Sequence, residues 1–396
     1  MPRDAKPVRV LMVLESNFPV HGGGGAESQV RTLALRLRER GHRVTVLTPR
    51  RQGMAVEIER YEGIPICRIG YPHIRLIGAL ILWLRLFLFL RRHGRRYDAW
   101  HVHIAHYLGA VTCAAAGSLR KPVVVKVSGW WELKKGLLRS DGGFAARIGK
   151  RFLQRATAVQ AISRRIEQEL LAQQFAPSRI VALPNAIDTR RFGTRAAPDA
   201  GGDALRTAIY VGRLVPEKGL DVLFEAWAKA FPQAGRARLL LVGAGSCEDA
   251  LRAQSERLGI AEQMHFLGHR DDIDALLRQP DFGVLPSTIE GLSNTMLEFM
   301  ASCVPVIASR VSGSEDFVVT GRNGWLFPSG DRDALALCLA EAAAMTREQL
   351  HALGCRARED VAERAGVDVV VDRLLALYRG ADPARTIAAT VAAAES

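Results

Sequence analysis

The chain has 396 residues, of which 48% are hydrophobic, and this is enough apolar material for two packed cores rather than one. Its net charge of +13 is unevenly divided, because residues 1–190 carry 32 Lys and Arg against 13 Asp and Glu, whereas residues 191–396 carry 22 against 28. A basic first half suits a phosphate-rich surface, either nucleic acid or an anionic membrane, and charge alone does not choose between them.

The six cysteines are scattered singly, which excludes a CxxC motif and any metal-ligand spacing. Thiols in a reducing cytosol are the simplest interpretation. The N-terminus shows no signal-peptide pattern, since strand-like apolar sequence begins at Val8. We therefore expect a cytoplasmic protein.

The first half alternates between short apolar runs and longer helical patterns. Residues 8–14 predict a strand, a glycine cluster and a helical pattern from Ala26 to Gly41 follow, and residues 43–48 predict a second strand. This order predicts a parallel βαβ unit. Four further strands are expected at 99–104, 123–127, 158–162 and 180–183.

Residues 193–206 lack apolar periodicity and predict a linker, after which the same alternation restarts. Strands are expected at 208–211, 238–242, 264–266, 282–285 and 304–308. The fold class is therefore α/β, with two Rossmann-like doubly wound parallel-sheet domains that face a cleft. We expect an N-terminal domain at 1–190 and a C-terminal domain at 205–375, followed by a C-terminal helix or tail at 376–396.

The segment 74–96 stands apart from this pattern. Residues 76–90 are apolar except for Gly78 and Arg85, and arginines flank them on both sides. The run is too short, and too interrupted by charge, to span a bilayer comfortably. Two interpretations stay open: a helix buried in the first domain, or a helix in the membrane interface with its arginines at anionic headgroups.

Two glutamates eight residues apart, Glu290 and Glu298, follow the strand that ends at Pro286. We expect a helix from near Gly291, whose first amides, from about Leu292 to Asn294, would favour a phosphate. Eight residues at helical rise span about 12 Å, which is comparable with the distance from a sugar, across a diphosphate, to a ribose. By itself, such a pair is more often two solvent-facing helix glutamates.

A loop between a strand and a helix carries two cations, Arg213 and Lys218, and is bounded by Gly212, Pro216 and Gly219. The two side chains are suited to neutralising a diphosphate leaving group. Taken alone, the loop is an ordinary solvated turn.

Taken together, these motifs have a familiar order. They are His21-Gly-Gly-Gly-Gly-Ala-Glu27, Asp98-Ala-Trp-His101-Val-His103, Leu183-Pro-Asn185-Ala-Ile-Asp188, the Arg213/Lys218 loop, Leu241-Val-Gly-Ala-Gly245, Phe266-Leu-Gly268, Pro286-Ser287, and Glu290 to Glu298 running into Pro305-Val-Ile-Ala-Ser309. Over nearly its whole length the chain resembles the retaining nucleotide-sugar glycosyltransferases of family 4, which have the GT-B fold.

The resemblance implies that residues 1–190 form the acceptor-side domain and residues 205–375 the donor nucleotide-sugar-binding domain. It also implies roles for individual residues. It implies that Arg213 and Lys218 bind the diphosphate, that Glu298 binds the ribose, and that His103 lines the cleft near the transferred sugar, whereas His101 is expected to be strand packing. It implies that Glu290 holds the donor sugar together with the amides of Leu292, Ser293 and Asn294, that Gly24 and Gly25 let the first loop approach the diphosphate, and that Arg270 lies near the nucleotide base.

The chain departs from the family pattern at three places. Ala186 stands where the family commonly has Gly, residues 312–315 replace a glycine pair, and residues 128–132 replace a frequent His-Gly element. Acceptor contacts therefore cannot be copied from other members. We expect Asn185, Trp130 and Trp131 on the acceptor side, where the two tryptophans could stack on a sugar, anchor at a membrane or pack in the core.

The resemblance also implies retention of the donor's anomeric configuration, no metal ion and no cofactor. Two D-x-D pairs, Asp272/Asp274 and Asp331/Asp333, are each expected to cap a helix rather than bind metal. The expected partners are a nucleotide-sugar donor, a glycan or lipid-linked acceptor, as in polysaccharide or glycolipid assembly, and an anionic membrane surface, but no nucleic acid.

Three rival functions each account for part of the same sequence. A nicotinamide-dependent dehydrogenase is disfavoured, because the glycines lack the dinucleotide spacing and the second strand ends without a ribose-binding acid. A non-catalytic protein that binds nucleic acid or membrane would explain the basic half only. A nucleotide-sugar epimerase of the same fold remains open, and the donor base and sugar cannot be read from the sequence.

Overall fold

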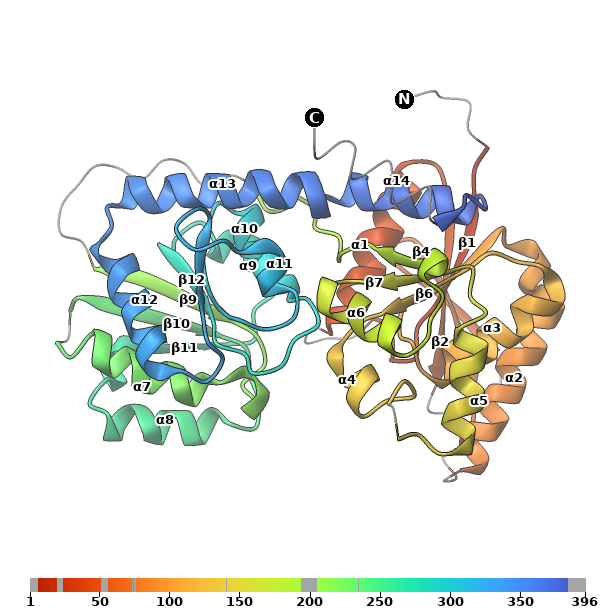
Figure 1. Cartoon of the computed structure of the whole chain (residues 1–396), viewed down its shortest axis with the longest axis horizontal. Coiled ribbons are helices and arrows are strands. Elements are labelled where there is room, and N and C mark those ends of the chain that lie inside the picture. The colour runs from red at the N-terminus through yellow and green to blue at the C-terminus, as the bar shows by residue number, and fades with distance from the viewer. Residues whose placement is uncertain are drawn as a thin grey trace. The chain divides into compact units, whose positions relative to one another are not determined.

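The computed structural model describes residues 6–19, 24–50, 56–72, 74, 76–139, 141–193, 205–233 and 235–383. The chain divides into two compact units, one of Met1–Ala186 with Val367–Ser396 and one of Ile187–Gly366 (Figure 1). Helix α14 (Val367–Tyr378) thus packs with the first unit, whereas the sequence suggested a second domain that runs to residue 375. The physical reason is that the apolar face of α14 completes the first unit's core. The expected linker (193–206) and tail (376–396) lie largely outside the described residues.

The first unit is built on an eight-stranded sheet with the order β3-β4-β2-β1-β5-β6-β7-β8. Its strands are β1 (Arg9–Val13), β2 (Arg43–Arg50), β3 (Val56–Tyr61), β4 (Ile64–Gly70), β5 (Ala99–Val102), β6 (Val123–Val127), β7 (Ala158–Ala161) and β8 (Ile180–Ala182). All pairs are parallel except β3 with β4. The six strands expected from the sequence are confirmed. The hairpin β3–β4 was missed, although the alternation of apolar and charged residues in β3 is a strand signal.

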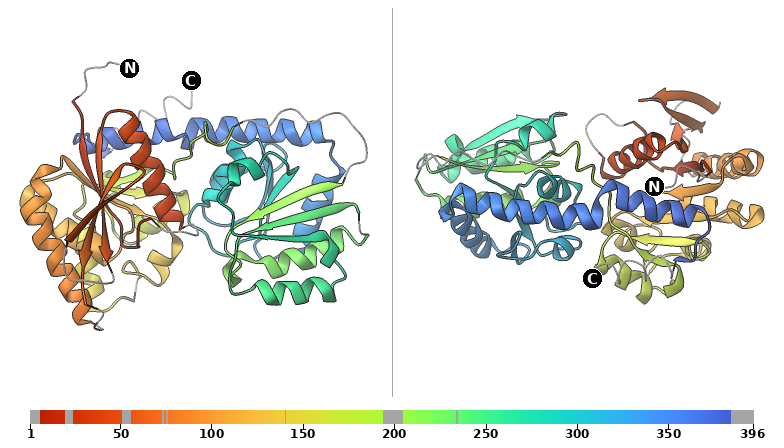
Figure 2. Two further views of the ribbon diagram at one scale, coloured as in Figure 1. Left: turned by 180° about the vertical axis from the view of Figure 1, so that it is seen from behind. Right: turned by 90° about the horizontal axis from the view of Figure 1, so that it is seen from above.

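Two layers of helices cover this sheet (Figures 1 and 2). Helices α1 (Gly25–Glu39) and α14 pack on one face, around the apolar side chains of β1, β2 and their neighbours. Helices α2 (Ile77–His93), α3 (Tyr107–Leu119) and α5 (Phe144–Leu153) lie side by side on the other face. The shorter helices are α4 (Trp130–Lys134) and α6 (Arg164–Ala172), with 3-10 turns η1 (Gly94–Arg96) and η2 (Pro177–Arg179).

A pair of buried hydrogen bonds ties α1 to the segment after β8. The Gln29 side chain donates to the Ala186 carbonyl at 2.9 Å and accepts from the Ala186 amide at 2.7 Å. Ala186 is not among the residues with positive φ, so this position does not require the glycine that the family commonly has. The departure noted in the sequence is therefore accommodated without strain.

The second unit has a six-stranded parallel sheet with the order β11-β10-β9-β12-β13-β14. Its strands are β9 (Arg206–Val211), β10 (Ala237–Val242), β11 (Met264–Gly268), β12 (Phe282–Leu285), β13 (Val306–Ser309) and β14 (Gly324–Phe327). Five of them were expected, and only β14 was missed. Because both sheets are doubly wound, the α/β two-domain prediction is confirmed.

The helices of the second unit again form two layers. Helices α7 (Leu220–Ala230), α8 (Glu248–Arg257) and α12 (Arg332–Ala344) pack side by side, and α10 (Asn294–Ala301) packs against α13 (Arg347–Ala365). Short helices α9 (Ile273–Leu276) and α11 (Ser314–Phe317) and the 3-10 turns η3 (Pro216–Lys218) and η4 (Ala261–Gln263) complete the unit.

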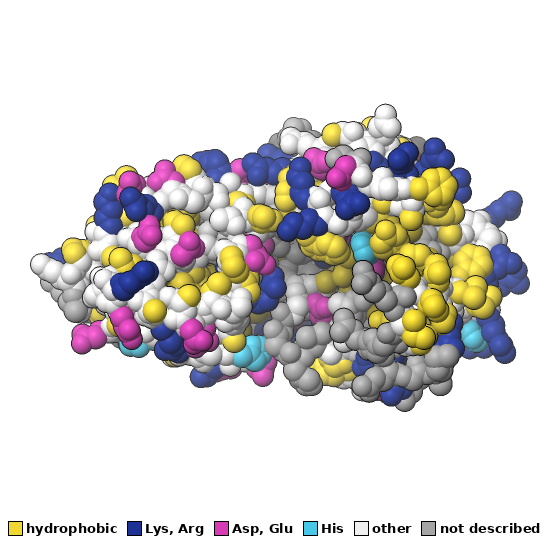
Figure 3. All heavy atoms as spheres, turned by 90° about the horizontal axis from the view of Figure 1, so that it is seen from below, with side chains coloured by type: hydrophobic (Ala, Val, Ile, Leu, Met, Phe, Trp, Pro, Cys, Tyr) yellow, Lys and Arg dark blue, Asp and Glu magenta, His cyan; other side chains and the backbone are white. Residues whose placement is uncertain are grey.

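Helix α2 has two apolar faces. Gly78, Leu82, Leu86 and Leu90 are buried, whereas Ile77, Leu80, Leu84 and Leu88 are 52–59% exposed. Hydrophobic side chains gather on one face of the first unit, bordered by Lys and Arg (Figure 3). Among the described residues, no helix is both long and apolar enough to span a membrane.

Each sheet contains one point where the winding reverses. In the first unit β1 continues to β2 on one side, while β5 continues to β6 on the other. In the second unit β9 continues to β10 and β12 continues to β13, again in opposite directions. In open α/β sheets, ligands bind at the carboxyl ends of the strands at such a switch point. The loops after β1, β5, β9 and β12 are therefore the places to look for a site.

Candidate functional site

The second unit's switch point brings together two residues that the sequence singled out. Lys218 lies in η3 after β9, Glu290 lies in the loop after β12, and their side chains form an ion pair in which each is only 18% exposed. The Ser287 hydroxyl donates to Glu290 Oε1 at 3.0 Å. The carboxylate and the ammonium are therefore held in place by contacts from both loops.

The two loops approach each other closely. Gly219 has a φ of 63°, and a Cβ at this position would lie 2.3 Å from the Pro286 carbonyl oxygen. The Thr288 amide also donates to the Glu217 carbonyl at 2.9 Å. A side chain at position 219 would push the loops apart, so glycine is required both for the backbone conformation and for the contact.

Arg213 lies on the same loop but is much more accessible. Its side chain is 63% exposed and faces Glu217 at 3.5 Å, while its carbonyl accepts a hydrogen bond from the Tyr210 hydroxyl at 2.8 Å. The backbone of Arg213 is thus fixed while its guanidinium remains at the surface. This arrangement suits a cation that meets an anionic ligand from solution.

The helix after Glu290 begins later than expected. Helix α10 starts at Asn294, with Ser293 as its N-cap accepting from the Met296 amide at 3.3 Å, and not near Gly291. The residues before it form a loop, and the Ser312 hydroxyl donates to the Gly291 carbonyl at 3.0 Å. The helical rise of eight residues therefore does not apply between Glu290 and Glu298, although the positive end of the helix still lies between them.

Glu298 is partly buried in the second turn of α10. Burial raises the pKa of its carboxyl to about 7, and the charge of Arg191 partly opposes this shift. Arg191 also pairs with Asp274 at 3.4 Å. Near neutral pH, Glu298 can thus be present in either protonation state.

The D-x-D pairs match their expected capping role only in part, and the expected place of Arg270 near the nucleotide base stays a prediction. Arg270 is exposed and its guanidinium pairs with Asp272 at 2.6 Å. Asp272 precedes α9, but its side chain does not cap the helix, because its carboxylate binds Arg270 instead. The capping role expected for Asp272 is therefore wrong. Asp331 does cap α12, accepting from the amides of Asp333 and Ala334. Within the described part of the chain, no group of three or more His, Cys, Asp or Glu side chains is placed to hold a metal ion.

His103 follows β5 in the first unit and is completely buried. Among the described residues neither ring nitrogen has a hydrogen-bond partner. Burial lowers its pKa well below the usual range, with further lowering by His101 and Lys126, so the ring is neutral. His101 stacks on it at 4.1 Å and shares a 2.7 Å hydrogen bond with the Tyr378 hydroxyl, which agrees with the packing role expected for His101.

The glycine loop is only partly described. Gly24 is the N-cap of α1 and Gly25 its first residue, so the loop leads directly into a helix N-terminus. Residues 20–23, which include the first glycines of this motif, lie outside the described residues. The expected approach of this loop to a diphosphate therefore stays a prediction.

The residues expected on the acceptor side also lie in the first unit. Asn185 is 5% exposed after β8, whereas Trp131 in α4 is 46% exposed. The Lys134 ammonium lies over the Trp130 ring, 5.4 Å from the ring centre. Asn185 is thus part of the interior, and Trp131 is the residue of the three that offers a large surface to a ligand.

The loop-holding role of several side chains was not expected from the sequence, notably that of Ser287, Ser312 and Glu132. Glu132 is fully buried, and burial raises the pKa of its carboxyl to about 7 despite three amide donors. A glutamate three residues after Gly129, at the start of a short helix, is the signal that could have revealed it.

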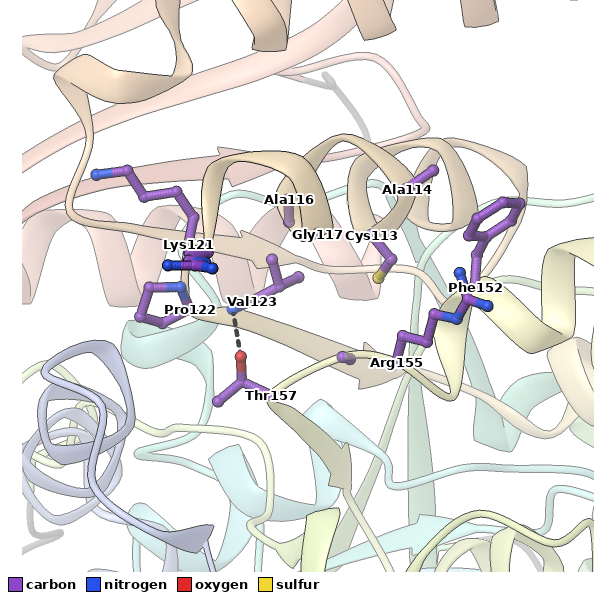
Figure 4. Close-up of a pocket in the computed structure, with 12 residues that line it drawn as sticks. Cys113, Ala114, Ala116, Gly117, Lys121, Pro122, Val123, Phe152, Arg155 and Thr157 are labelled. Carbon is purple, nitrogen blue, oxygen red and sulfur yellow. Dashed lines mark hydrogen bonds between the residues drawn. The ribbon is translucent and has the colours of Figure 1, made fainter.

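A larger cavity than the space beside Glu290 lies elsewhere, in the first unit. It has a volume of about 340 Å³, and Arg120, Lys121, Arg155 and Thr157 are among its lining residues (Figure 4). It lies at the amino end of β6, where α3 and α5 end, and helix C-termini disfavour anions. A second cavity of about 10 Å³, lined by Ser287, Glu290 and other residues, has room for roughly one water.

Two family descriptions match the chain. Residues 23–191 match the model described as Glycosyltransferase Family 4, and residues 206–344 match the model described as Glycosyl transferases group 1. Between them the two matches cover most of the chain, and the second one contains the second unit's switch point.

Named relatives include a phosphatidyl-myo-inositol mannosyltransferase of Mycobacterium tuberculosis, which is 27% identical over 94% of this chain and 96% of its own length. WcaL of Salmonella typhimurium, whose name assigns it to colanic acid biosynthesis, is 31% identical over 51% of this chain. The matched region spans about half of the length of WcaL (52%).

Solved structures agree with the fold. HepE of Anabaena in complex with UDP has a TM-score of 0.73 and 20% identity, covering 93% of this chain and 98% of HepE. WaaG, a glycosyltransferase involved in lipopolysaccharide biosynthesis, has a TM-score of 0.68 and 19% identity, covering 94% of this chain and all of WaaG. With its two doubly wound sheets and both family matches, the chain belongs to glycosyltransferase family 4 and has the GT-B fold.

Proposed function

We propose that this glycosyltransferase moves a sugar from a nucleotide-diphosphate sugar to a glycan or lipid-linked acceptor, with retention of the anomeric configuration and without a metal ion or cofactor. The observation that carries this proposal is the ion pair of Lys218 and Glu290 at the second unit's switch point. HepE was solved with UDP, and the mannosyltransferase and WcaL are named for glycolipid and polysaccharide assembly, which supports the same substrate classes.

The donor's charges fit the groups around this pair. A diphosphate brings negative charge to Lys218, to the exposed guanidinium of Arg213 and to the positive end of α10. The carboxylate oxygens of Glu290 accept hydrogen bonds from sugar hydroxyls. Glu298 accepts from the ribose hydroxyls.

In the reaction, the bond between the anomeric carbon and the diphosphate oxygen breaks, and the diphosphate leaves with both electrons. Lys218 and Arg213 stabilise the negative charge that develops. The acceptor oxygen bonds to the anomeric carbon on the same face, and its proton passes to the departing phosphate oxygen. Glu290 positions the sugar in this scheme and does not form a bond to it.

The first unit supplies a surface for an anionic membrane, which would place the enzyme peripherally on the cytoplasmic face. The exposed leucines of α2 form one apolar stripe, and Arg91, Arg92, Arg95 and Arg96 follow in its last turn and in η1. Leucines can enter the headgroup boundary while arginines meet lipid phosphates. We propose that α2 lies in this boundary.

The donor cradle predicts the outcome of two substitutions. Lys218→Ala and Glu290→Gln should each lower kcat by about 100-fold or more, because each removes a group that stabilises charge or orients the sugar. Sugar transfer and slow donor hydrolysis are measured with a panel of UDP- and GDP-sugars.

Arg332→Ala is the matched control, since this arginine is 62% exposed and pairs with Glu225 in the same unit. Its kcat should stay at the wild-type value. Wild-type rates in Glu290→Gln would refute the proposed cradle, whereas conversion of the donor sugar without acceptor would identify an epimerase.

Glu298 predicts a pH dependence of donor binding. Its raised pKa of about 7 means that the carboxylate gains charge between pH 6 and pH 8, so donor affinity should rise over this range. Stability should move in the opposite direction, because a carboxyl with a raised folded-state pKa stabilises the fold at low pH and loses this contribution as pH rises through 7. Calorimetric titration of UDP checks the affinity, and Glu298→Gln should flatten its pH profile.

The proposed mechanism predicts that transfer persists in EDTA and that the product keeps the donor's anomeric configuration. Donor and product configuration are compared by NMR coupling constants at the anomeric proton. Activity that collapses in EDTA and returns with Mn²⁺ would contradict metal independence, and an inverted product would contradict retention.

The membrane proposal predicts vesicle binding through α2. Charge reversal of the four arginines at 91, 92, 95 and 96 should weaken binding to phosphatidylglycerol vesicles by at least about 100-fold, since each arginine near an anionic surface is worth about 1 kcal/mol. Replacing Leu80, Leu84 and Leu88 by serine should also weaken it.

Two controls accompany this cosedimentation assay. Phosphatidylcholine vesicles remove the anionic charge, and Leu337→Ser removes a leucine of the second unit that is 73% exposed, more than any of the three in α2. Intact binding by the arginine variant would count decisively against the proposal.

A further inference from the structure

The cavity of about 340 Å³ in the first unit lies away from both switch points. Val123, the first residue of β6, lines it together with residues of α3 and α5 (Figure 4). The switch-point loops of this unit lie at the opposite, carboxyl edge of the same sheet. Pockets for small molecules have volumes of about 300–1,000 Å³. The cavity is therefore large enough for a small ligand, and the proposed transfer reaction makes no use of it.

Small side chains on α3 leave this space open. The residues of α3 that line the cavity are Cys113, Ala114, Ala116 and Gly117. A Cβ added at Gly117 would meet nothing within 4 Å. Burial raises the pKa of the Cys113 thiol to about 12, so this side chain acts as an apolar wall and not as a nucleophile. Because protein interiors are normally filled by side chains, a run of small residues beside an open space suits a ligand.

Three cations line the same cavity, and none of the described residues that line it is Asp or Glu. Arg120 and Arg155 are exposed, and within the described ranges neither guanidinium is paired with a carboxylate. The Arg155 guanidinium lies over the Phe152 ring, 5.4 Å from the ring centre. Lys121 is partly engaged, because its charge also acts on Asp98. The cavity thus combines apolar walls with unbalanced positive charge.

The ends of α3 and α5 do not cancel this charge. Each helix C-terminus carries about −0.5 of an elementary charge, so the two together oppose only about half of the charge of Arg120 and Arg155. The end of α5 also has a cation of its own, since Arg179 donates to the Gln154 carbonyl at 2.8 Å. At the end of α3, the Arg120 amide bonds to the Ala116 carbonyl. The cavity therefore still attracts an anion.

Thr157 adds a directional group to the cavity. Its hydroxyl oxygen accepts a hydrogen bond from the Val123 amide at 3.0 Å, which fixes the side chain beside β6 (Figure 4). The hydroxyl proton is then a donor for a ligand. A phosphate monoester carries up to about two negative charges at neutral pH and three acceptor oxygens, which suit two guanidinium groups and one hydroxyl better than the single charge of a carboxylate does.

We propose that this cavity binds an organic phosphate monoester, whose phosphate meets Arg120, Arg155 and Thr157 and whose apolar group lies against α3. The cavity and the donor cradle belong to different units, so this ligand is distinct from the nucleotide sugar. The inference goes beyond the proposed function and does not depend on it.

Two sources supply such a phosphate, a soluble metabolite and a lipid headgroup. The 3-10 turn η1, with Arg95 and Arg96, lies against the end of α3, since a Cβ at Gly94 would lie 3.3 Å from a Leu119 methyl carbon. The cavity therefore adjoins the arginines for which a membrane contact is proposed. A phosphatidic acid headgroup and a soluble phosphate ester present the same chemistry to it.

Methyl NMR tests the site with phenyl phosphate as the probe, in the presence of excess UDP to occupy the donor cradle. The methyl signals of Val123 and Ala156, which line the cavity, should shift during the titration. Inorganic phosphate should bind at least about tenfold more weakly, because it lacks the apolar group. Phenol should also bind at least about tenfold more weakly, because it lacks the charge.

Two kinds of variant separate the charge from the cavity. Arg120→Glu combined with Arg155→Glu should weaken binding of phenyl phosphate by at least about 100-fold, because attraction becomes repulsion. Gly117→Leu should abolish binding by filling the cavity, and it should raise the melting temperature, since leucine favours a helix more than glycine does. Gly117→Ala, which adds one methyl group, should weaken binding by a smaller factor.

Arg151→Glu and Ser118→Leu are the matched controls. They place the same side chains at exposed positions of α5 and α3 that do not line the cavity. Both variants should bind phenyl phosphate as the wild type does.

Vesicles distinguish the two sources of the phosphate. Binding is compared between phosphatidic acid and phosphatidylglycerol vesicles of equal surface potential. Tighter binding to phosphatidic acid, lost in Gly117→Leu, identifies a lipid ligand. Equal binding to both lipids, with phenyl phosphate still bound in solution, identifies a soluble one.

Three results would overturn the inference. The first is a titration in which phenyl phosphate leaves the Val123 and Ala156 methyl signals in place. The second is wild-type affinity in the variant with both arginines reversed. The third is binding of phenol or inorganic phosphate that is as tight as that of phenyl phosphate, because the site would then recognise only one half of the proposed ligand.

Discussion

The handedness of parallel β connections is the constraint on which both candidate sites depend. A crossover between parallel strands is right-handed, so reversing the direction of winding moves the next helix to the opposite face of the sheet. The loops after β1 and β5 diverge for this reason, as do those after β9 and β12. The space between diverging loops lies at the carboxyl ends of the strands, and the chain places its charged and aromatic side chains there. The place of a candidate site in each unit is thus determined by strand order before it is determined by individual residues.

The ion pair of Lys218 and Glu290 illustrates how this space is organised. Removing two charges from water costs about as much as their attraction returns, so a partly buried pair contributes little to stability. Its value is better sought in preorganisation, because both groups are already oriented before a ligand arrives. Gly219 makes this possible by letting the two loops touch, and Ser287 completes the hydrogen bonding of the carboxylate. In the first unit, too, a glutamate side chain links two loops. Glu132 does so by accepting hydrogen bonds from backbone amides, whereas Glu290 pairs with a lysine.

The sequence predicted the architecture well because apolar runs in a parallel sheet are short and continuous, and eleven of the fourteen strands were expected from them. The sequence pattern could predict that Lys218 and Glu290 lie on loops. Only the family resemblance predicted that the two residues are close in space, because the periodicity of apolar residues does not show which strands are neighbours in the sheet. The start of α10 was misplaced because the bonds that hold residues 288–293 as a loop come from Ser312 and Glu217, which are distant in sequence. Glu132 was missed for a similar reason: its partners lie on two loops whose adjacency is a property of the fold.

Helix α2 shows why a pattern of apolar residues could not decide between burial and membrane contact. Both faces of the helix are apolar, and packing against α3 and β4 determines which leucines are covered. The two interpretations of the sequence therefore describe two faces of one helix. The arginines that follow it have a second explanation, because cations near a helix C-terminus offset the helix dipole. The exposed leucines have no such explanation. Leu80, Leu84 and Leu88 are 55–59% exposed, so each forgoes roughly half of the 1.5–3 kcal/mol that full burial of such a side chain gives, and a run of them at helical spacing favours a covering partner. The leucine stripe, more than the positive charge, is thus the feature that argues for a membrane.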